Sequence, residues 1–182
     1  MRRLLALLLL ATLVRPALAG DPAPTTLVLA ARSIGSRRGD PPERRAHAAL
    51  LVTFPGRPGG VIVQGGKEKV HGFFRDGARV VGYVIPCADP AIEFTRAYGA
   101  FWGEASVRDL PTTVLARFSV PGLDEERIRA MVAALNDDLA PREYRLEAGP
   151  SSNSFVSLFL DALKLPLPPV GGAELPGWGW RP

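Results

Sequence analysis

The sequence predicts a single α+β domain in which an antiparallel sheet packs against helices. Two observations carry this prediction. Short apolar runs of strand length follow one another between residues 47 and 85, separated by turns that contain Gly and Pro. Two later segments, 124–139 and 155–165, repeat their apolar residues at helical spacing and are bounded by capping and helix-breaking residues.

Residues 1–19 have the three parts of a secretory signal peptide. Arg2-Arg3 is a basic start, residues 4–14 form an apolar run, and Ala17-Leu18-Ala19 fits a small-x-small cleavage site. The apolar run is shorter than the ~18 residues needed to span a bilayer. We therefore expect cleavage near Ala19/Gly20 and an exported protein, periplasmic or secreted, without a transmembrane segment. The remaining 163 residues suit one domain.

Six segments share the apolar or alternating pattern of strands: 25–31, 47–54, 61–64, 67–74, 79–85 and 112–120. The first belongs to a polar, arginine-rich N-terminal segment, 20–46, which we expect to precede the folded domain. The second and third are joined by a turn rich in Pro and Gly and form a predicted hairpin. The fourth and fifth turn around Arg75-Asp76-Gly77 and extend the hairpin into an antiparallel meander.

Three segments have helical patterns: 89–98, 124–139 and 155–165. Asp124 can cap the second, and Pro141 closes it. The third has one broad apolar face, is preceded by Ser151–Ser154 and is stopped by the prolines that follow it. The folded domain is therefore expected to span 47–165. The tail, 166–182, is rich in Pro, Gly and Trp, so we expect no regular structure there; its tryptophans either pack on the domain or line a groove.

Composition narrows the function classes. The chain has 22 Lys and Arg against 18 Asp and Glu, and three of the arginines lie in the predicted leader, which leaves 19 against 18. The sequence has no basic stripe with interleaved aromatic residues, so it does not indicate nucleic-acid binding. Cys87 is the single cysteine, and His47 and His71 are the two histidines, so the sequence predicts neither an internal disulfide nor a zinc or multi-histidine metal site, and no cofactor. We interpret Cys87 as structural rather than nucleophilic.

The small polar cluster Ser151-Ser152-Asn153-Ser154 at the start of the last helix has two interpretations. Ser and Asn are favoured at helix starts because their side-chain oxygens accept bonds from the first, otherwise unpaired, N–H groups. Alternatively, one hydroxyl is a nucleophile placed where the helix dipole stabilises negative charge.

The order of these elements resembles the permuted branch of the papain-like NlpC-type superfamily, the group that includes lecithin retinol acyltransferase. In that branch a His opens a strand in a motif like H-W-A-I, and the matching text here is His47-Ala48-Ala49-Leu50. The nucleophile is a Cys in a motif like N-C-x-x-F-V at the start of a late helix. Ser152 stands in that position within Ser151–Val156, and Gln64 is in the place of the polar residue that orients the His. The resemblance implies a papain-like fold over 47–165.

Part of the chain is also similar to a family of uncharacterised bacterial envelope proteins with a Y-R-L-x-x-G-P-N-S-N-T-F-V type segment followed by L-P-P and a small residue. The matching text is Tyr144-Arg145-Leu146, Gly149-Pro150, Ser152–Val156 and Leu167-Pro168-Pro169. This similarity covers roughly residues 47–180 and implies that serine is the usual residue at position 152. Ser151 departs from the Asn of that family, and the family implies no activity.

The superfamily pattern implies a site in which Ser152 is the nucleophile, His47 is the base and Gln64 orients the imidazole. Such a site suits hydrolysis or transfer of an acyl group from an amide or ester in the cell envelope, where the superfamily acts on peptidoglycan peptides and lipid acyl chains. Helix N–H groups would form the oxyanion hole. Gln64 would fix the tautomer of His47 but would not stabilise imidazolium as a carboxylate does.

Three alternatives stay open. A hydroxyl in place of the thiol is a weaker nucleophile, so the chain is alternatively a catalytically inactive papain-like module that binds an envelope peptide, glycan or lipid. A second alternative is an interaction protein that binds a partner through the tail with Trp178 and Trp180. His71 is the reserve base if His47 does not reach Ser152.

Overall fold

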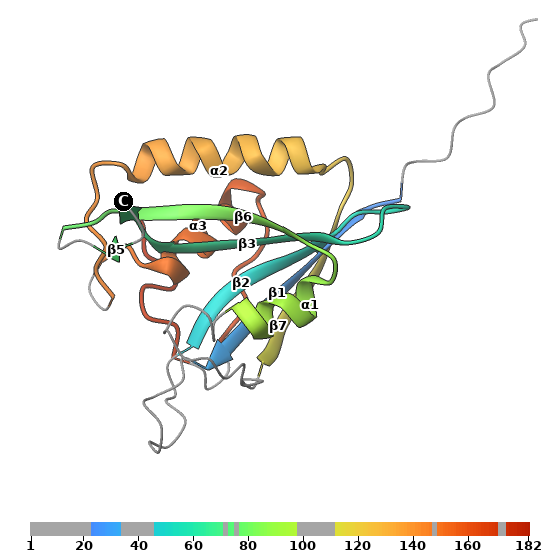
Figure 1. Cartoon of the computed structure of the whole chain (residues 1–182), viewed down its shortest axis with the longest axis horizontal. Coiled ribbons are helices and arrows are strands. Elements are labelled where there is room, and N and C mark those ends of the chain that lie inside the picture. The colour runs from blue at the N-terminus through green and yellow to red at the C-terminus, as the bar shows by residue number, and fades with distance from the viewer. Residues whose placement is uncertain are drawn as a thin grey trace, which may run out of the picture.

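The computed structural model describes residues 23–33, 46–70, 73–74, 77–97, 112–146, 149–170 and 174–182. Its elements in chain order are β1 (Thr25–Ser33), β2 (Ala46–Thr53), β3 (Gly60–Lys67), β4 (Lys69–Val70), β5 (Phe73–Phe74), β6 (Val80–Cys87), α1 (Pro90–Ala97), β7 (Thr112–Val120), α2 (Glu125–Leu139) and α3 (Ser152–Ala162). The predicted α+β class with an antiparallel sheet is confirmed (Figure 1). The predicted signal peptide lies outside the described residues.

The main sheet has five strands in the order β6-β3-β2-β1-β7, and every neighbouring pair is antiparallel. β1 therefore lies between β2 and β7, so the N-terminal segment that we expected to precede the domain supplies one of its inner strands. The prediction of one strand over 67–74 is wrong. β3 ends at Lys67 and pairs directly with β6, while β4 and β5 form a separate two-stranded sheet.

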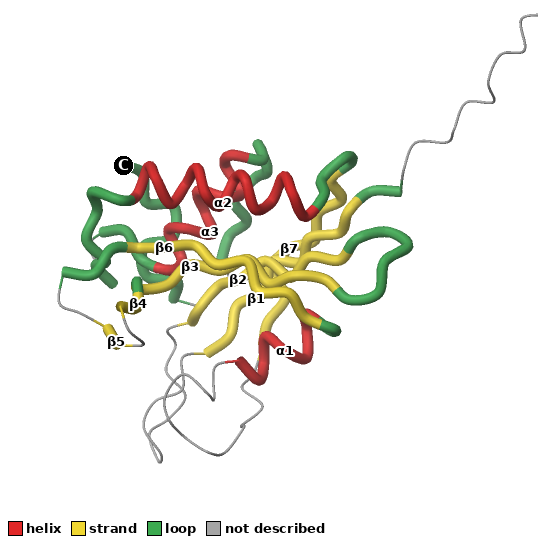
Figure 2. Tube along the Cα trace, turned by 45° about the horizontal axis from the view of Figure 1, so that its top comes forward, coloured by secondary structure: helices red, strands yellow, loops and turns green. Residues whose placement is uncertain are grey.

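The sheet is covered by helices on both faces. Figure 2 shows α2 and α3 on one side and α1 on the other. All β2 residues from Ala46 to Val52 are buried, as expected of a nearly continuous apolar run in an inner strand. Because successive side chains point to opposite faces, Leu50 joins the larger core under α2 and α3, whereas Leu51 joins a smaller core with Phe94 of α1.

The α2 helix begins where the sequence predicts. Asp124 is its N-cap, and its carboxylate accepts a hydrogen bond from the Arg127 N–H. Ile128, Val132 and Leu139 are buried. Near its end the amide of Asn136 accepts a hydrogen bond from Gly82 N at 2.6 Å and donates one to Gly82 O at 3.2 Å. The helix therefore occupies the N–H and C=O groups of Gly82 on the edge strand β6.

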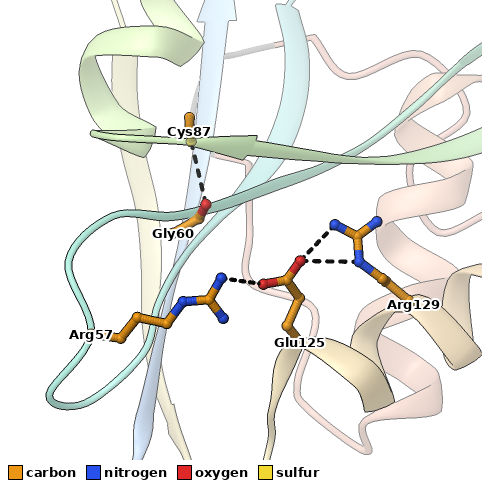
Figure 3. A network of polar contacts seen from close by, with 5 residues as sticks. All are labelled: Arg57, Gly60, Cys87, Glu125 and Arg129. Atoms are coloured by element: carbon orange, nitrogen blue, oxygen red, sulfur yellow. Dashed lines mark hydrogen bonds and ion pairs between the residues drawn. The ribbon is translucent and has the colours of Figure 1, made fainter.

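A charged cluster joins the start of α2 to the β2–β3 turn (Figure 3). Glu125 binds Arg57 of the turn at 2.7 Å and Arg129 of its own helix at 2.5 Å. On the neighbouring strands, the thiol of Cys87 lies 3.7 Å from the carbonyl oxygen of Gly60. Burial is the main cause that raises the pKa of this thiol, which disfavours the thiolate.

The C-terminal tail packs on the domain, which is the first of the two arrangements that we expected. Leu175 is buried, and Trp178 and Trp180 lie half-buried against the larger core. The backbone N–H of Ala46, at the start of β2, donates a hydrogen bond to the carbonyl of Glu174 at 2.8 Å. Among the described residues, no helix is both long and apolar enough to cross a membrane.

Candidate active site

The serine cluster divides its tasks between neighbouring residues. Ser151 is the N-cap of α3: its hydroxyl oxygen accepts from the N–H groups of Asn153 and Ser154, and the Ser154 hydroxyl accepts in turn from the Ser151 N–H. This capping box satisfies the helix start without Ser152, which is the first helical residue. The hydroxyl of Ser152 is therefore not needed as a cap.

The Ser152 hydroxyl instead meets His47. Its Oγ lies 3.1 Å from Nδ1 of the imidazole, although the two residues are separated by 105 positions in the chain. Both side chains are nearly buried, with exposed fractions of 7% for Ser152 and 6% for His47. The two residues that the sequence proposes as nucleophile and base are thus within hydrogen-bonding distance.

Gln64 of β3 completes a three-residue chain. Its Oε1 lies 3.1 Å from Nε2 of His47. Because an amide oxygen only accepts hydrogen bonds, this contact places the imidazole proton on Nε2. The lone pair of Nδ1 then faces Ser152 and accepts a hydrogen bond from its hydroxyl. This is the protonation state that a general base needs before it removes a proton.

The meeting of Ser152 and His47 depends on a separation of two strands. β2 and β3 are paired from Thr53↔Gly60 to Ala49↔Gln64 and no further, whereas β3 continues beside β6 to Lys67. Figure 1 shows the start of β2 turning away from β3. The first turn of α3 packs here against β3, where a Cβ at Gly65 would overlap the Ser152 carbonyl oxygen and lie 2.6 Å from the Cβ of Phe155.

His47 is held neutral by its surroundings. Its pKa is lowered to about 4: burial is the main cause, the positive charge of Arg32 acts in the same direction, and the hydrogen bond to Gln64 opposes both. Arg32 is itself buried and lies beside His47 in the β1–β2 register. Its guanidinium carbon lies 4.5 Å from the centroid of the Phe94 ring, and it donates a hydrogen bond to the Phe94 carbonyl.

Fewer backbone N–H groups of the first turn of α3 are available to bind an oxyanion than the sequence predicts. The N–H groups of Asn153 and Ser154 are already bound by Ser151 Oγ. The N–H of Ser152, at the first helical position, has no acceptor within its own helix. It is therefore the backbone donor that α3 can direct at an oxygen developing charge next to Ser152.

The reserve base, metal binding and two residues whose roles the sequence did not predict complete the description of the site. His71, the reserve base, lies outside the described residues. In the part of the chain that the structure describes, no group of three or more His, Cys, Asp or Glu side chains is placed to hold a metal ion. Sequence patterns did not single out Arg32, because a buried cation inside a strand has no periodic signal. They also did not separate the role of Asn153 from capping.

Comparison of the chain with protein-family models, with curated proteins and with solved structures finds no match.

Proposed function

We propose that this protein is an exported acyl hydrolase or acyltransferase of the cell envelope that cleaves an amide or ester. Ser152 is the nucleophile, His47 the general base and Gln64 the residue that orients the imidazole. The observation that carries the proposal is the continuous contact from Ser152 Oγ to His47 Nδ1 and from His47 Nε2 to Gln64 Oε1, each at 3.1 Å. A nucleophile within reach of a base that a third group orients is the arrangement on which covalent acyl transfer depends.

The proposed reaction has two halves. In the first, Ser152 Oγ attacks the carbonyl carbon of the substrate while His47 Nδ1 takes the hydroxyl proton. The tetrahedral oxyanion is stabilised by the Ser152 N–H, and its collapse breaks the bond to the leaving amine or alcohol, which receives the proton from His47. In the second half, water or an acceptor alcohol attacks the acyl-serine with His47 as base, and Ser152 regains its proton.

The papain-like assignment and the location are part of this proposal. The early strand that begins near His47, the late helix that begins at Ser152 and the antiparallel sheet are compatible with the permuted NlpC-type arrangement. The signal-peptide pattern in residues 1–19 supports export to the periplasm or beyond. The substrate would then be an envelope peptide or lipid.

A second candidate function is a catalytically inactive module that binds an envelope peptide, glycan or lipid. The observation that favours it is the burial of His47 beside the buried, positively charged Arg32, which together lower the pKa of the imidazole to about 4. Attack by Ser152 must convert His47 to imidazolium. Burial and the positive charge of Arg32 both disfavour this cation, and the neutral Gln64 does not stabilise it as a carboxylate would. In this case the contact between Ser152 and His47 would be structural.

Labelling with a fluorophosphonate separates the two functions. The proposed enzyme becomes covalently modified at Ser152, which mass spectrometry locates, and Ser152→Ala abolishes the modification. Ser157→Ala is the matched control, because it removes another buried hydroxyl of α3 that does not touch His47. Absence of labelling, together with saturable binding to envelope fractions that survives Ser152→Ala, would reject the enzyme in favour of the binding module.

A further inference from the structure

The start of β2 is paired with β1 on one side but is not paired with β3 on the other. His47 lies beyond Ala49↔Gln64, the last pair between β2 and β3, so β3 does not pair with the residues around the base. On that side the N–H of Ala46 binds the Glu174 carbonyl of the tail at 2.8 Å. Ser152, on α3, belongs to an element that is not part of the sheet. The distance between nucleophile and base therefore depends on the hydrogen bonds that join this end of β2 to the first turn of α3.

The side chain of Asn153 makes that junction. Its Oδ1 accepts a hydrogen bond from Ala48 N at 2.8 Å, and its Nδ2 donates to Ala46 O at 3.1 Å. The residue that follows the nucleophile thus binds the backbone on both sides of the base. Nδ2 also donates to Pro176 O at 3.2 Å, which ties the tail to the same point. Asn153 is 1% exposed, so these bonds form away from solvent.

An amide is the side chain that fits these partners. One oxygen meets one N–H donor, and the two N–H groups of the amide meet two carbonyl oxygens. An apolar side chain would leave three buried backbone groups without their bonds. A carboxylate would direct negative charge at the two carbonyl oxygens, whereas a protonated carboxyl would keep the acceptor and one donor.

We propose that Asn153 is a positioning residue for the Ser152–His47 pair, a role that rests on the proposed function for its catalytic meaning. Its amide binds Ala46 and Ala48 where β3 no longer pairs with β2, and so holds the imidazole at hydrogen-bonding distance from the hydroxyl. Its side chain binds backbone groups of Ala48, Ala46 and Pro176 rather than the hydroxyl of Ser152. It acts through the backbone of Ala46 and Ala48.

The test compares Asn153→Ala with Ser157→Ala, which removes another hydrogen bond between α3 and the tail, from Gly179 N to Ser157 Oγ, instead of the bonds to β2. Both are assayed below their thermal transitions. Misplacement of reacting groups by about 1 Å costs on the order of 100-fold in rate, so we expect fluorophosphonate labelling of Ser152 to slow by about 100-fold in Asn153→Ala and to stay close to wild type in Ser157→Ala. Equal rates in the two variants would overturn the proposal.

A second readout does not depend on activity. In protein labelled with ¹⁵N-histidine, the Nδ1 resonance of His47, assigned with His47→Gln, reports the hydrogen bond from Ser152. We expect Asn153→Ala to move this resonance to its position in Ser152→Ala, and Ser157→Ala to leave it in place. An unchanged Nδ1 resonance in Asn153→Ala overturns the positioning role. If wild-type protein is not labelled but the resonance moves as expected, the proposed enzyme fails and the positioning role holds.

Asn153→Asp keeps the proposal testable if the alanine variant does not fold. Burial among carbonyl oxygens raises the pKa of the introduced carboxyl, and the protonated form retains the acceptor and one donor. We expect the Nδ1 resonance to be close to wild type when this carboxyl is protonated and to move as pH rises through its pKa. A resonance that follows the wild-type pH profile at every pH would contradict the proposal.

Discussion

Gln64 Oε1 and His47 Nε2 lie 3.1 Å apart, on the side of the imidazole that faces away from Ser152. The amide fixes the tautomer but carries no charge, so it does not compensate an imidazolium. In Gln64→Glu a carboxylate would take this place, and we expect the pKa of His47 to rise above about 4. Labelling of Ser152 by a fluorophosphonate should become at least about tenfold faster at pH 7.

An NMR titration of His47 and the labelling rate together check this prediction. Gln64→Leu is the control: it has a similar volume but no acceptor, and it should slow labelling because Nε2 loses the group that holds its proton. A variant with a raised pKa and an unchanged labelling rate would show that imidazolium stability does not limit the reaction.

The protonation of His47 links stability to pH. Above pH 6.5 the imidazole is neutral in both folded and unfolded protein, so its contribution is fully present. As pH falls from 6.5 towards about 4, the unfolded chain binds a proton that the folded protein excludes, and the free energy of unfolding decreases. Between pH 7.5 and pH 5 this loss amounts to about 2 kcal/mol. Below about pH 4 the contribution no longer changes.

Denaturant unfolding of wild type and His47→Gln at the two pH values measures this loss. The variant has no imidazole at position 47, so its stability should decrease by about 2 kcal/mol less than that of wild type over the same interval. Identical pH dependence in the two proteins would mean that His47 titrates normally when folded.

Gly177 and Gly179 form a matched pair in the tail. Their φ angles are +76° and +72°, so alanine is strained at both. A Cβ at Gly179 meets nothing within 4 Å, whereas a Cβ at Gly177 lies 2.5 Å from Ser151 Oγ and 2.6 Å from Ser154 Oγ. We expect Gly179→Ala to cost about 1 kcal/mol and Gly177→Ala about 1–3 kcal/mol more. Thermal or denaturant unfolding gives both values; equal losses would mean that the tail is not held against the serines.

Gly65 allows the first turn of α3 to approach β3. A Cβ at this position would overlap the Ser152 carbonyl oxygen, so we expect Gly65→Ala to destabilise the protein by about 1–3 kcal/mol and to displace Ser152 from His47. Labelling should slow even at temperatures where the variant is fully folded. Gly82→Ala is the comparison, because its Cβ would overlap the ring of Phe155 in the core. Similar labelling rates in both variants, relative to their stability, would contradict a direct effect on Ser152.

Local patterns predicted most element positions well. The segment 112–120 coincides with β7, and the capped helix 124–139 coincides with α2 and its Asp124 cap. These elements carry their own signals, namely apolar periodicity and a capping side chain at the right place. The pairing of His47, Gln64 and Ser152 came from the resemblance to a known superfamily, since no local pattern relates residues that are 105 positions apart.

The sequence-based predictions are wrong where tertiary contacts determine the end of a strand or the burial of a helix. Lys67 continues β3 because Val80 pairs with it, and β4 and β5 form a separate two-stranded sheet. The last helix was expected to bury one face, but every residue from Ser151 to Leu160 is buried. The additional burial comes from the tail, whose carbonyls at Pro176 and Gly177 accept hydrogen bonds from serine hydroxyls. Hydrophobic periodicity does not register such contacts.

The bond between Asn136 and Gly82 also bears on how the protein behaves at high concentration. An edge strand with open N–H and C=O groups invites a second molecule to extend the sheet, the first step of aggregation. On β6 both groups of Gly82 are taken by the Asn136 amide, so an incoming strand would have to break two hydrogen bonds in order to pair there. At the opposite edge, β7 presents the exposed charge of Arg117 at mid-strand, which disfavours the approach of an apolar strand.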